Sequence, residues 1–231
     1  METNINPTTG GANMARRSFL RYAGAGAAAV AVFGAASCGK DYIKNPDGTY
    51  IDIGAGDVGI LNYAYALEQL EAAFYLQVVA TPYSGISIAE TAYLTDIKDH
   101  EVLHRDFFKT ALGSAAIPAL EVDFSSINFS DRTAVLAAAK TFEDTGVKAY
   151  DGAGYLIQSA DYLTIAGKIV SVEARHAALI ANLISPGSFA NPDQVDENGI
   201  NRSATIAEVL AAVNPLLKKK VYAANFNYPI A

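Results

Sequence analysis

Four long segments of the chain place apolar residues at every third or fourth position, a spacing typical of amphipathic helices. These segments cover residues 57–80, 87–112, 131–157 and 161–184. The first ends before Pro82, the second at Gly113 and the fourth before Pro186, and both residue types commonly end helices. An alternation with period two is nowhere sustained for long. The pattern therefore predicts an all-α fold.

The helix starts and the connections predict how the segments are arranged. Ser87 with Glu90, and the Thr-x-x-Glu sequence at Thr205, form capping boxes, and the second begins a short C-terminal helix. The connections within each pair of long segments are short, whereas about 18 residues separate the second segment from the third. That length can cross a bundle. We expect a four-helix bundle of two antiparallel pairs, with a long crossover between helices 2 and 3.

The N-terminal region resembles an export signal. Residues 15–22 read ARRSFLRY, with a twin arginine, and residues 23–37 are rich in alanine and glycine. This apolar run of about 14 residues is too short for a membrane span, which needs roughly 20. The only cysteine, Cys38, follows it as in bacterial lipoproteins, whose cysteine is lipidated. The alternative is cleavage near Ala36, which would leave Cys38 as a free thiol. We expect a periplasmic protein or a membrane-anchored lipoprotein of a bacterial envelope.

Charge and length limit the remaining possibilities. Without residues 1–37 the chain keeps 14 basic and 23 acidic residues, a net charge of −9, which disfavours nucleic acid as a partner. The rest is long enough for one domain with a substantial core. We divide the chain into a signal, a flexible linker, the bundle, and a polar loop with the C-terminal helix and tail. These parts are residues 1–37, 38–56, 57–185 and 186–231. Lys218 to Lys220 are expected at a solvated helix end.

Gly54, Gly56 and Gly59 match the G-x-G-x-x-G pattern of dinucleotide sites. Such a site needs a parallel strand after the helix and an acidic residue about 20 positions on. More helix follows instead. We therefore expect these glycines to form a flexible lead-in to the first helix.

Each predicted helix carries a glutamate on its apolar side, and two of the helices add a histidine three residues later. These residues are Glu68, Glu101, His104, Glu143, Glu173 and His176. A buried carboxylate without a cationic partner is very costly, and no lysine or arginine lies on these stripes. Two divalent ions would balance the four carboxylates. The residues thus predict a metal site with two ions.

The spacing of these residues repeats between the two halves of the chain. Tyr75 and Tyr150 each stand seven residues after a glutamate, Glu68 and Glu143 respectively. The glutamate of the following Glu-x-x-His unit, Glu101 or Glu173, stands 33 residues after Glu68 and 30 after Glu143. Such an internal repeat favours a pseudo-twofold axis through a dinuclear carboxylate site.

The phrases LNYAYALEQLEAAFY, GVKAYDGAG and VEARHAALI resemble the ferritin-like superfamily over roughly residues 57–185. The resemblance is to exported bacterial ferritin-like domain proteins related to plant desiccation-associated proteins. It implies that Glu101 and Glu173 bridge the two metals and that Glu68 and Glu143 are terminal ligands. It also implies that each histidine, His104 and His176, binds one metal.

Several neighbours leave alternatives open. Glu71 shares the stripe of Glu68 and could replace it as a ligand, although the repeat favours Glu68. His100 is expected at the surface or behind the ligands. Tyr75 and Tyr150 could donate hydrogen bonds near the metals or carry a radical, but core packing is favoured. Asp144 could orient a ligand histidine.

The ligand set suits iron or manganese, with zinc possible. The leading hypothesis is an envelope metalloprotein that consumes peroxide or oxygen as a peroxidase, a catalase-like enzyme or a ferroxidase. The alternative is a non-catalytic protective or interaction module with a structural or empty metal site. An iron-storage shell fits less well. The chain has no C-x-x-C unit, so an electron donor would be another protein. A homodimer is compatible with the sequence.

Overall fold

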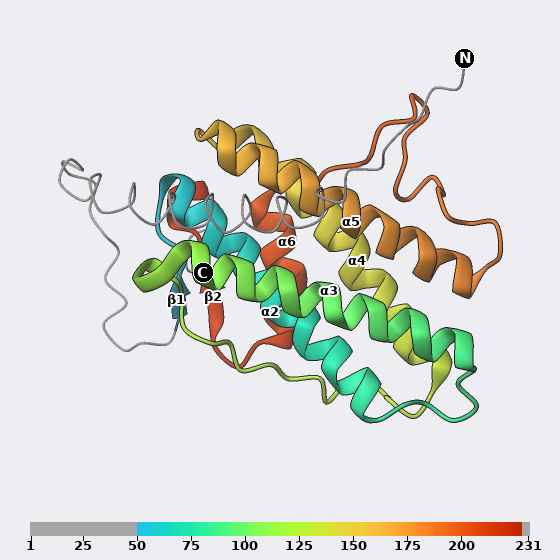
Figure 1. Ribbon diagram of the computed structural model, residues 1–231. Coiled ribbons are helices and arrows are strands. Elements are labelled where there is room, and N and C mark those ends of the chain that lie inside the picture. Colours follow the sequence, from blue (N-terminus) through green and yellow to red (C-terminus); the bar gives the residue numbers. More distant parts are fainter. Residues whose placement is uncertain (1–49, 228–231) are drawn as a thin grey trace, which may run out of the picture. The chain divides into compact units, whose positions relative to one another are not determined.

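The computed structural model describes residues 50–227, and four long helices form the main part of this region (Figure 1). They are α2 (Gly56–Ala80), α3 (Ile88–Leu112), α4 (Arg132–Ala153) and α5 (Ala160–Ile184). The expected export signal and Cys38 lie outside the described residues. The all-α prediction is confirmed, and three of the helices end within a residue of their predicted positions. The third ends earlier, at Ala153, and a 3₁₀ turn follows it (Gly154–Leu156).

The helices pack as two pairs, α2 with α3 and α4 with α5, and contacts between α2 and α4 join the pairs. The capping box of Ser87 and Glu90 begins α3 as expected. Arg132, at the start of α4, donates to the Glu90 carboxylate at 2.7 Å and to the carbonyl of Leu183 in α5 at 3.0 Å. One guanidinium therefore ties the ends of three helices together.

Helix α2 lies at the centre and is buried on nearly every side. The crossover, residues 113–130, runs along the bundle after a short 3₁₀ turn (Gly113–Ala115) (Figure 1). Two polar side chains of α2 hold it. Asn62 donates to the carbonyl of Ala115 at 2.9 Å, and Gln69 accepts from the Leu120 amide at 2.8 Å. The crossover is thus fixed against the helix that supplies the first glutamate.

A small parallel sheet joins the two ends of the described region. Strand β1 (Tyr50–Asp52) pairs with β2 (Lys220–Tyr222). Residues 50–52 fall in the segment that we expected to be a flexible linker, and they form a strand instead. Gly54 and Gly56 then adopt φ angles of 89° and 58°, which suit glycine, in the turn that leads into α2. These glycines therefore form a defined turn.

The C-terminal part consists of α6 (Ile206–Val213), two 3₁₀ turns (Asn214–Leu216 and Ala224–Phe226) and β2. The capping box at Thr205 begins α6 as predicted. The expectation of a solvated helix end is wrong for Lys220, which lies in β2 and donates to the carbonyls of Asn214 and Leu217. Its ammonium group therefore ties β2 to the 3₁₀ turn before it.

The segment before α6 packs closely on α4. The Ala204 amide donates to the Lys148 carbonyl at 3.0 Å. A Cβ atom added at Gly152 would lie 1.8 Å from the Ala204 carbonyl oxygen, so only glycine fits there. Within residues 50–227, no helix has the length and apolar character needed to cross a membrane.

Candidate metal centre

The four predicted glutamates meet at the centre of the bundle, one from each long helix. Each of them has a solvent exposure of 0%. They are Glu68 of α2, Glu101 of α3, Glu143 of α4 and Glu173 of α5. The helical period explains this, because each glutamate continues the apolar stripe that packs into the core. His104 and His176 lie one turn after Glu101 and Glu173 and face the same centre, and His104 is the more accessible of the two.

The donor atoms form two groups that share two glutamates. In the first group, His104 Nδ1 lies 2.8 Å from a Glu173 oxygen and 3.4 Å from a Glu68 oxygen. In the second group, His176 Nδ1 lies 2.9 Å from a Glu101 oxygen and 3.5 Å from a Glu143 oxygen. The ligand atoms of each group lie within 4.8 Å of one another.

Glu101 and Glu173 belong to both groups, and each directs a different oxygen to each. Glu173 places Oε1 near His104 and Oε2, at 3.3 Å, near His176. Glu101 places Oε1 near His176 and Oε2, at 3.9 Å, near His104. This geometry is compatible with the bridging roles that the resemblance implies for Glu101 and Glu173.

Unsatisfied polar atoms test whether these residues fit metal ions. Among the residues that the structure describes, eight buried atoms of this cluster have no hydrogen-bond partner. They are Oε2 of Glu68, Oε2 of Glu143, both oxygens of Glu101, both oxygens of Glu173, and Nδ1 of His104 and His176. Buried polar atoms are nearly always paired, so such a concentration needs an explanation. The eight atoms divide into four for each group, and two metal ions would satisfy all of them.

The remaining oxygens of the terminal glutamates accept hydrogen bonds from tyrosines. Tyr150 donates to Glu68 Oε1 at 2.5 Å, and Tyr75 donates to Glu143 Oε1 at 2.5 Å. The tyrosine of each half of the repeat thus binds the glutamate of the other half. The sequence favours simple core packing for both tyrosines, and each also makes this hydrogen bond. Their hydroxyl groups in fact bind Oε1, whereas Oε2 of Glu68 and of Glu143 has no hydrogen-bond partner.

His100 lies behind the ligand His176. Its Nδ1 is 2.9 Å from His176 Nε2, and the two rings are stacked with their centroids 5.1 Å apart. For His176 to bind metal through Nδ1, its proton must lie on Nε2, from which it can donate to His100. We expect His100 at the surface or behind the ligands, and it is exposed and contacts His176.

The cluster strongly shifts the pKa values of its members. Burial and the neighbouring Glu173 raise the pKa of Glu68 and of Glu101. Burial also raises the pKa of Glu143 to about 7. Burial disfavours the charged forms of both Glu173 and His104, but the hydrogen-bonding contact between them has the larger effect. The pKa of Glu173 is therefore lowered to about 2, and the pKa of His104 is raised to about 10. In the same way, carboxylates that include Glu101 raise the pKa of His176 to about 12 against the effect of burial. Without metal, protons on the histidines therefore compensate the negative charge.

Glu71 and Asp144 lie beside this centre without joining either group. Glu71 is 4% exposed, and its Oε1 would lie 2.9 Å from a Cβ atom at Gly146 of α4. Burial and Glu101 raise the pKa of Glu71 well above its usual value. The geometry thus favours Glu68 as the ligand. The expectation for Asp144 is wrong, because its carboxylate binds Lys140 and Gln194 instead of orienting a histidine.

The fold and the site together define a four-helix carboxylate protein with two Glu-x-x-His units. The sequence model of the ferritin-like domain family matches residues 56–186, from the start of α2 to just beyond α5. The chain therefore belongs to the ferritin-like domain family. No curated protein matches the sequence.

Proposed function

We propose that the chain is an exported dinuclear iron or manganese protein that carries out redox chemistry on peroxide or oxygen in the cell envelope. The observation that supports this most is the set of eight buried donor atoms without a hydrogen-bond partner, which forms two four-atom groups with shared glutamates. Carboxylate and imidazole donors without thiolates suit iron or manganese, with zinc possible.

A pair of redox-active ions would supply two electrons, the number that reduces hydrogen peroxide with two protons to two molecules of water. The chain's own residues hold and shield the site. Glu101 and Glu173 would keep two ions close together, because each offers one oxygen to each group. The tyrosines fix the terminal carboxylates, and the burial of all four glutamates limits the access of water.

The proposed location rests on the N-terminal sequence. Twin-arginine signals direct export, and the same route passes folded proteins. A folded bundle could therefore receive its metals before export. Lipidation of Cys38 would anchor the domain to a membrane. Mass spectrometry of the mature N-terminus would test both proposals, since a diacylglyceryl-modified Cys38 differs from a cleaved chain with a free thiol.

Metal content is the first test of the site. The protein is purified from its native envelope and analysed for metals, together with the double variant Glu101→Ala, Glu173→Ala. A second double variant, Glu121→Ala, Glu197→Ala, removes two exposed acids as a matched control. We expect about two iron or manganese ions per chain in the native protein and in this control. Metal in the native protein no higher than in the first variant would contradict the proposal.

A non-catalytic module with a structural metal is the second candidate. The complete burial of the four glutamates favours it, because a structural site needs no open position. Turnover separates the two candidates. Steady consumption of peroxide by the metal-loaded protein, or of oxygen with a supplied electron donor, supports catalysis. A loaded protein that resists unfolding but turns over neither substrate supports the structural role.

A further inference from the structure

The turn between α4 and α5 exposes apolar side chains at one end of the bundle. Residues 154–163 read GYLIQSADYL, in which Tyr155 is 83% exposed and Leu163 is 47% exposed. A Cβ atom added at Gly154 would lie 3.9 Å from Leu163 Cδ1, so both sides of the turn lie together. We call Tyr155, Leu163 and the partly exposed Leu156 the apolar tip. Apolar side chains that gather on a surface are typical of a contact region.

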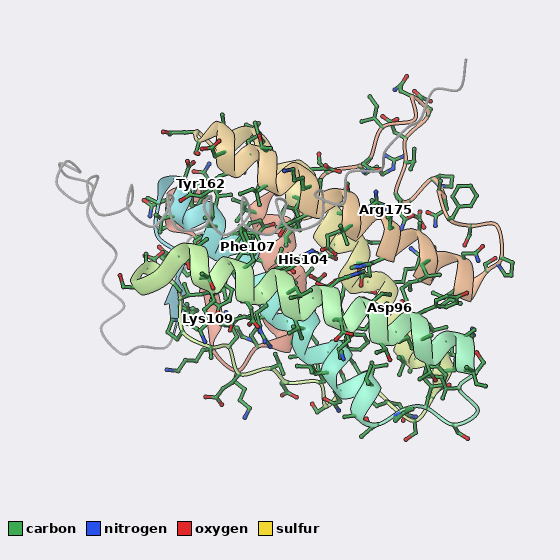
Figure 2. All side chains as sticks on the ribbon, viewed as in Figure 1. Asp96, His104, Phe107, Lys109, Tyr162 and Arg175 are labelled. Carbon is green, nitrogen blue, oxygen red and sulfur yellow. The ribbon has the colours of Figure 1, made fainter. Side chains whose placement is uncertain are left out.

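The apolar tip lies at the end of the bundle where α2 begins. The Asp57 carboxylate, in the first turn of α2, accepts from the backbone amides of Gln158 and Ser159 at 2.8 and 2.9 Å. Figure 2 shows Tyr162, in the first turn of α5, at this end of the bundle, whereas Asp96 lies toward the other end. One acidic side chain therefore fixes the tip beside the start of the first long helix.

The described part of the chain also begins at this end. Strand β1 starts at Tyr50, and the carbonyl of Ile53, just after the strand, accepts from Asn62 of α2 at 3.1 Å. Cys38, the proposed lipid anchor, stands 12 residues before Tyr50. A link of this length spans at most about 40 Å when it is fully extended. The proposed anchor thus joins the domain at the end that carries the apolar tip.

The opposite end of the bundle also exposes apolar side chains. They are Ile88 at the start of α3, which is 92% exposed, and Ile184 at the end of α5, which is 43% exposed. A helix of 25 residues is about 37 Å long. The opposite end could meet a membrane only if the link to Cys38 were almost fully extended, which would cost most of its conformational entropy. The point of attachment therefore favours the tip.

We propose that the apolar tip rests on the lipid bilayer to which Cys38 anchors the chain. Tyrosine is common at membrane–water interfaces, because its ring is apolar and its hydroxyl group can reach water. Leucine side chains gain free energy when they leave water. The inference rests on the proposed export and anchoring, and it identifies the surface with which the anchored domain meets the membrane.

The anchor makes so small a contact effective. Three side chains are too few to hold a free protein on a membrane, and an acidic chain is not attracted by anionic lipids. A short link keeps the tip at a high effective concentration near the bilayer, so the second contact forms within the anchored molecule. Glu173 stands ten residues after Leu163, about 15 Å along α5. A contact confined to the tip therefore leaves the metal centre outside the bilayer.

The fluorescence of single tryptophans tests the contact, because the chain contains no tryptophan. Tyr155→Trp and Leu163→Trp place the fluorophore in the tip. Ile88→Trp replaces an exposed apolar side chain at the opposite end and is the matched control. All three positions are exposed, so the substitutions leave the core unchanged.

The variants are purified from the native envelope and reconstituted in vesicles of phosphatidylethanolamine and phosphatidylglycerol, with either ordinary or brominated acyl chains. Where Cys38 carries no lipid, its thiol, the only one in the chain, is coupled to a maleimide lipid in the same vesicles. Bromine quenches tryptophan only at short range. We expect the brominated chains to lower the fluorescence of both tip variants about twofold, since an interfacial side chain reaches the acyl region, and to leave Ile88→Trp unchanged.

Three results would overturn the inference. The first is unquenched fluorescence of both tip variants in the anchored protein, and the second is equal quenching of Ile88→Trp. The third is a blue shift of the tip variants without vesicles that grows with protein concentration, because the tip would then pair with a second copy of the chain. A failure of the proposed anchoring is distinguishable, since it appears as an unmodified Cys38 in the mass spectrum. The coupled vesicles still test the tip in that case.

Discussion

Metal binding should release protons, and the pKa values of the cluster predict how many. The perturbation is the addition of two equivalents of manganese(II) or iron(II) to the metal-free protein at pH 7. His104 and His176, with pKa values of about 10 and 12, each hold a proton that would have to leave before Nδ1 could bind a metal. The two histidines should therefore release about two protons when two metal ions bind.

The glutamates add to this number. Glu143, with a pKa of about 7, is about half protonated at pH 7. The raised pKa of Glu101 adds up to one more proton. Since ligand carboxylates must be ionised, we expect between about two and about four protons for two metal ions. Glu173, with a pKa of about 2, should release none.

Calorimetric titration in buffers of different ionisation enthalpy measures this number directly, because the slope of heat against buffer enthalpy equals the protons released. The variant His176→Gln should bind one ion less tightly and release about one proton fewer. The variant Glu121→Gln changes an exposed acid and should release as many protons as the native protein. Release of fewer than one proton at pH 7 would refute the reasoning, since it would mean that the histidines are neutral without metal or are not ligands.

Three further predictions concern stability and the tyrosines. Gly152→Ala should lower the free energy of unfolding by about 1 to 3 kcal/mol in urea titrations, because the new Cβ would meet the Ala204 carbonyl oxygen; helix propensity alone would instead raise it by about 1 kcal/mol. The melting temperature of the metal-free protein should fall as pH rises from 5 to 9 in scanning calorimetry. The raised pKa values of the two Glu-x-x-His histidines stabilise the fold fully below pH 6.5, and this stabilisation is lost toward pH 10 to 12, while Glu143 adds a loss between pH 4.5 and 7; a melting temperature that rises over this range would contradict the sign. Tyr150→Phe frees Glu68 Oε1 and should weaken one metal ion about 10-fold in competition with a chelator, with the other ion unchanged.

The helices and the buried cluster of glutamates and histidines could be predicted because each leaves a local signal. Every third or fourth position of the long helices is apolar, and a glutamate within such a stripe is conspicuous because its burial is costly. Glu143 repeats the position of Glu68, and the second Glu-x-x-His unit repeats the first. This repeat identified the set of candidate metal-binding residues. These signals need no knowledge of tertiary contacts.

The errors concern features that depend on distant parts of the chain. Strand β1 pairs with residues about 170 positions away, and three residues are too few for a pattern of period two. Asp144 stands next to Glu143, but one residue along a helix turns the side chain by about 100°, here toward Lys140 and Gln194. The choice between Glu68 and Glu71 also required the neighbouring helix. Gly146, which corresponds to Glu71 in the repeat, was the signal that could have indicated it.

The differences between the two halves of the repeat show that the two groups of donor atoms are not equivalent. Where α2 carries Glu71, α4 carries Gly146, and the missing side chain makes room for the Glu71 carboxylate. Where α3 carries His100 before its ligand glutamate, α5 carries Val172. In the second group, His100 can accept a hydrogen bond from His176. In the first group, the apolar Val172 cannot accept one from His104. The candidate ligands are nearly symmetric, but the hydrogen bonds and charges around them are not. Two ions of the same metal would therefore be in different electrostatic environments and bind in two steps with different affinities.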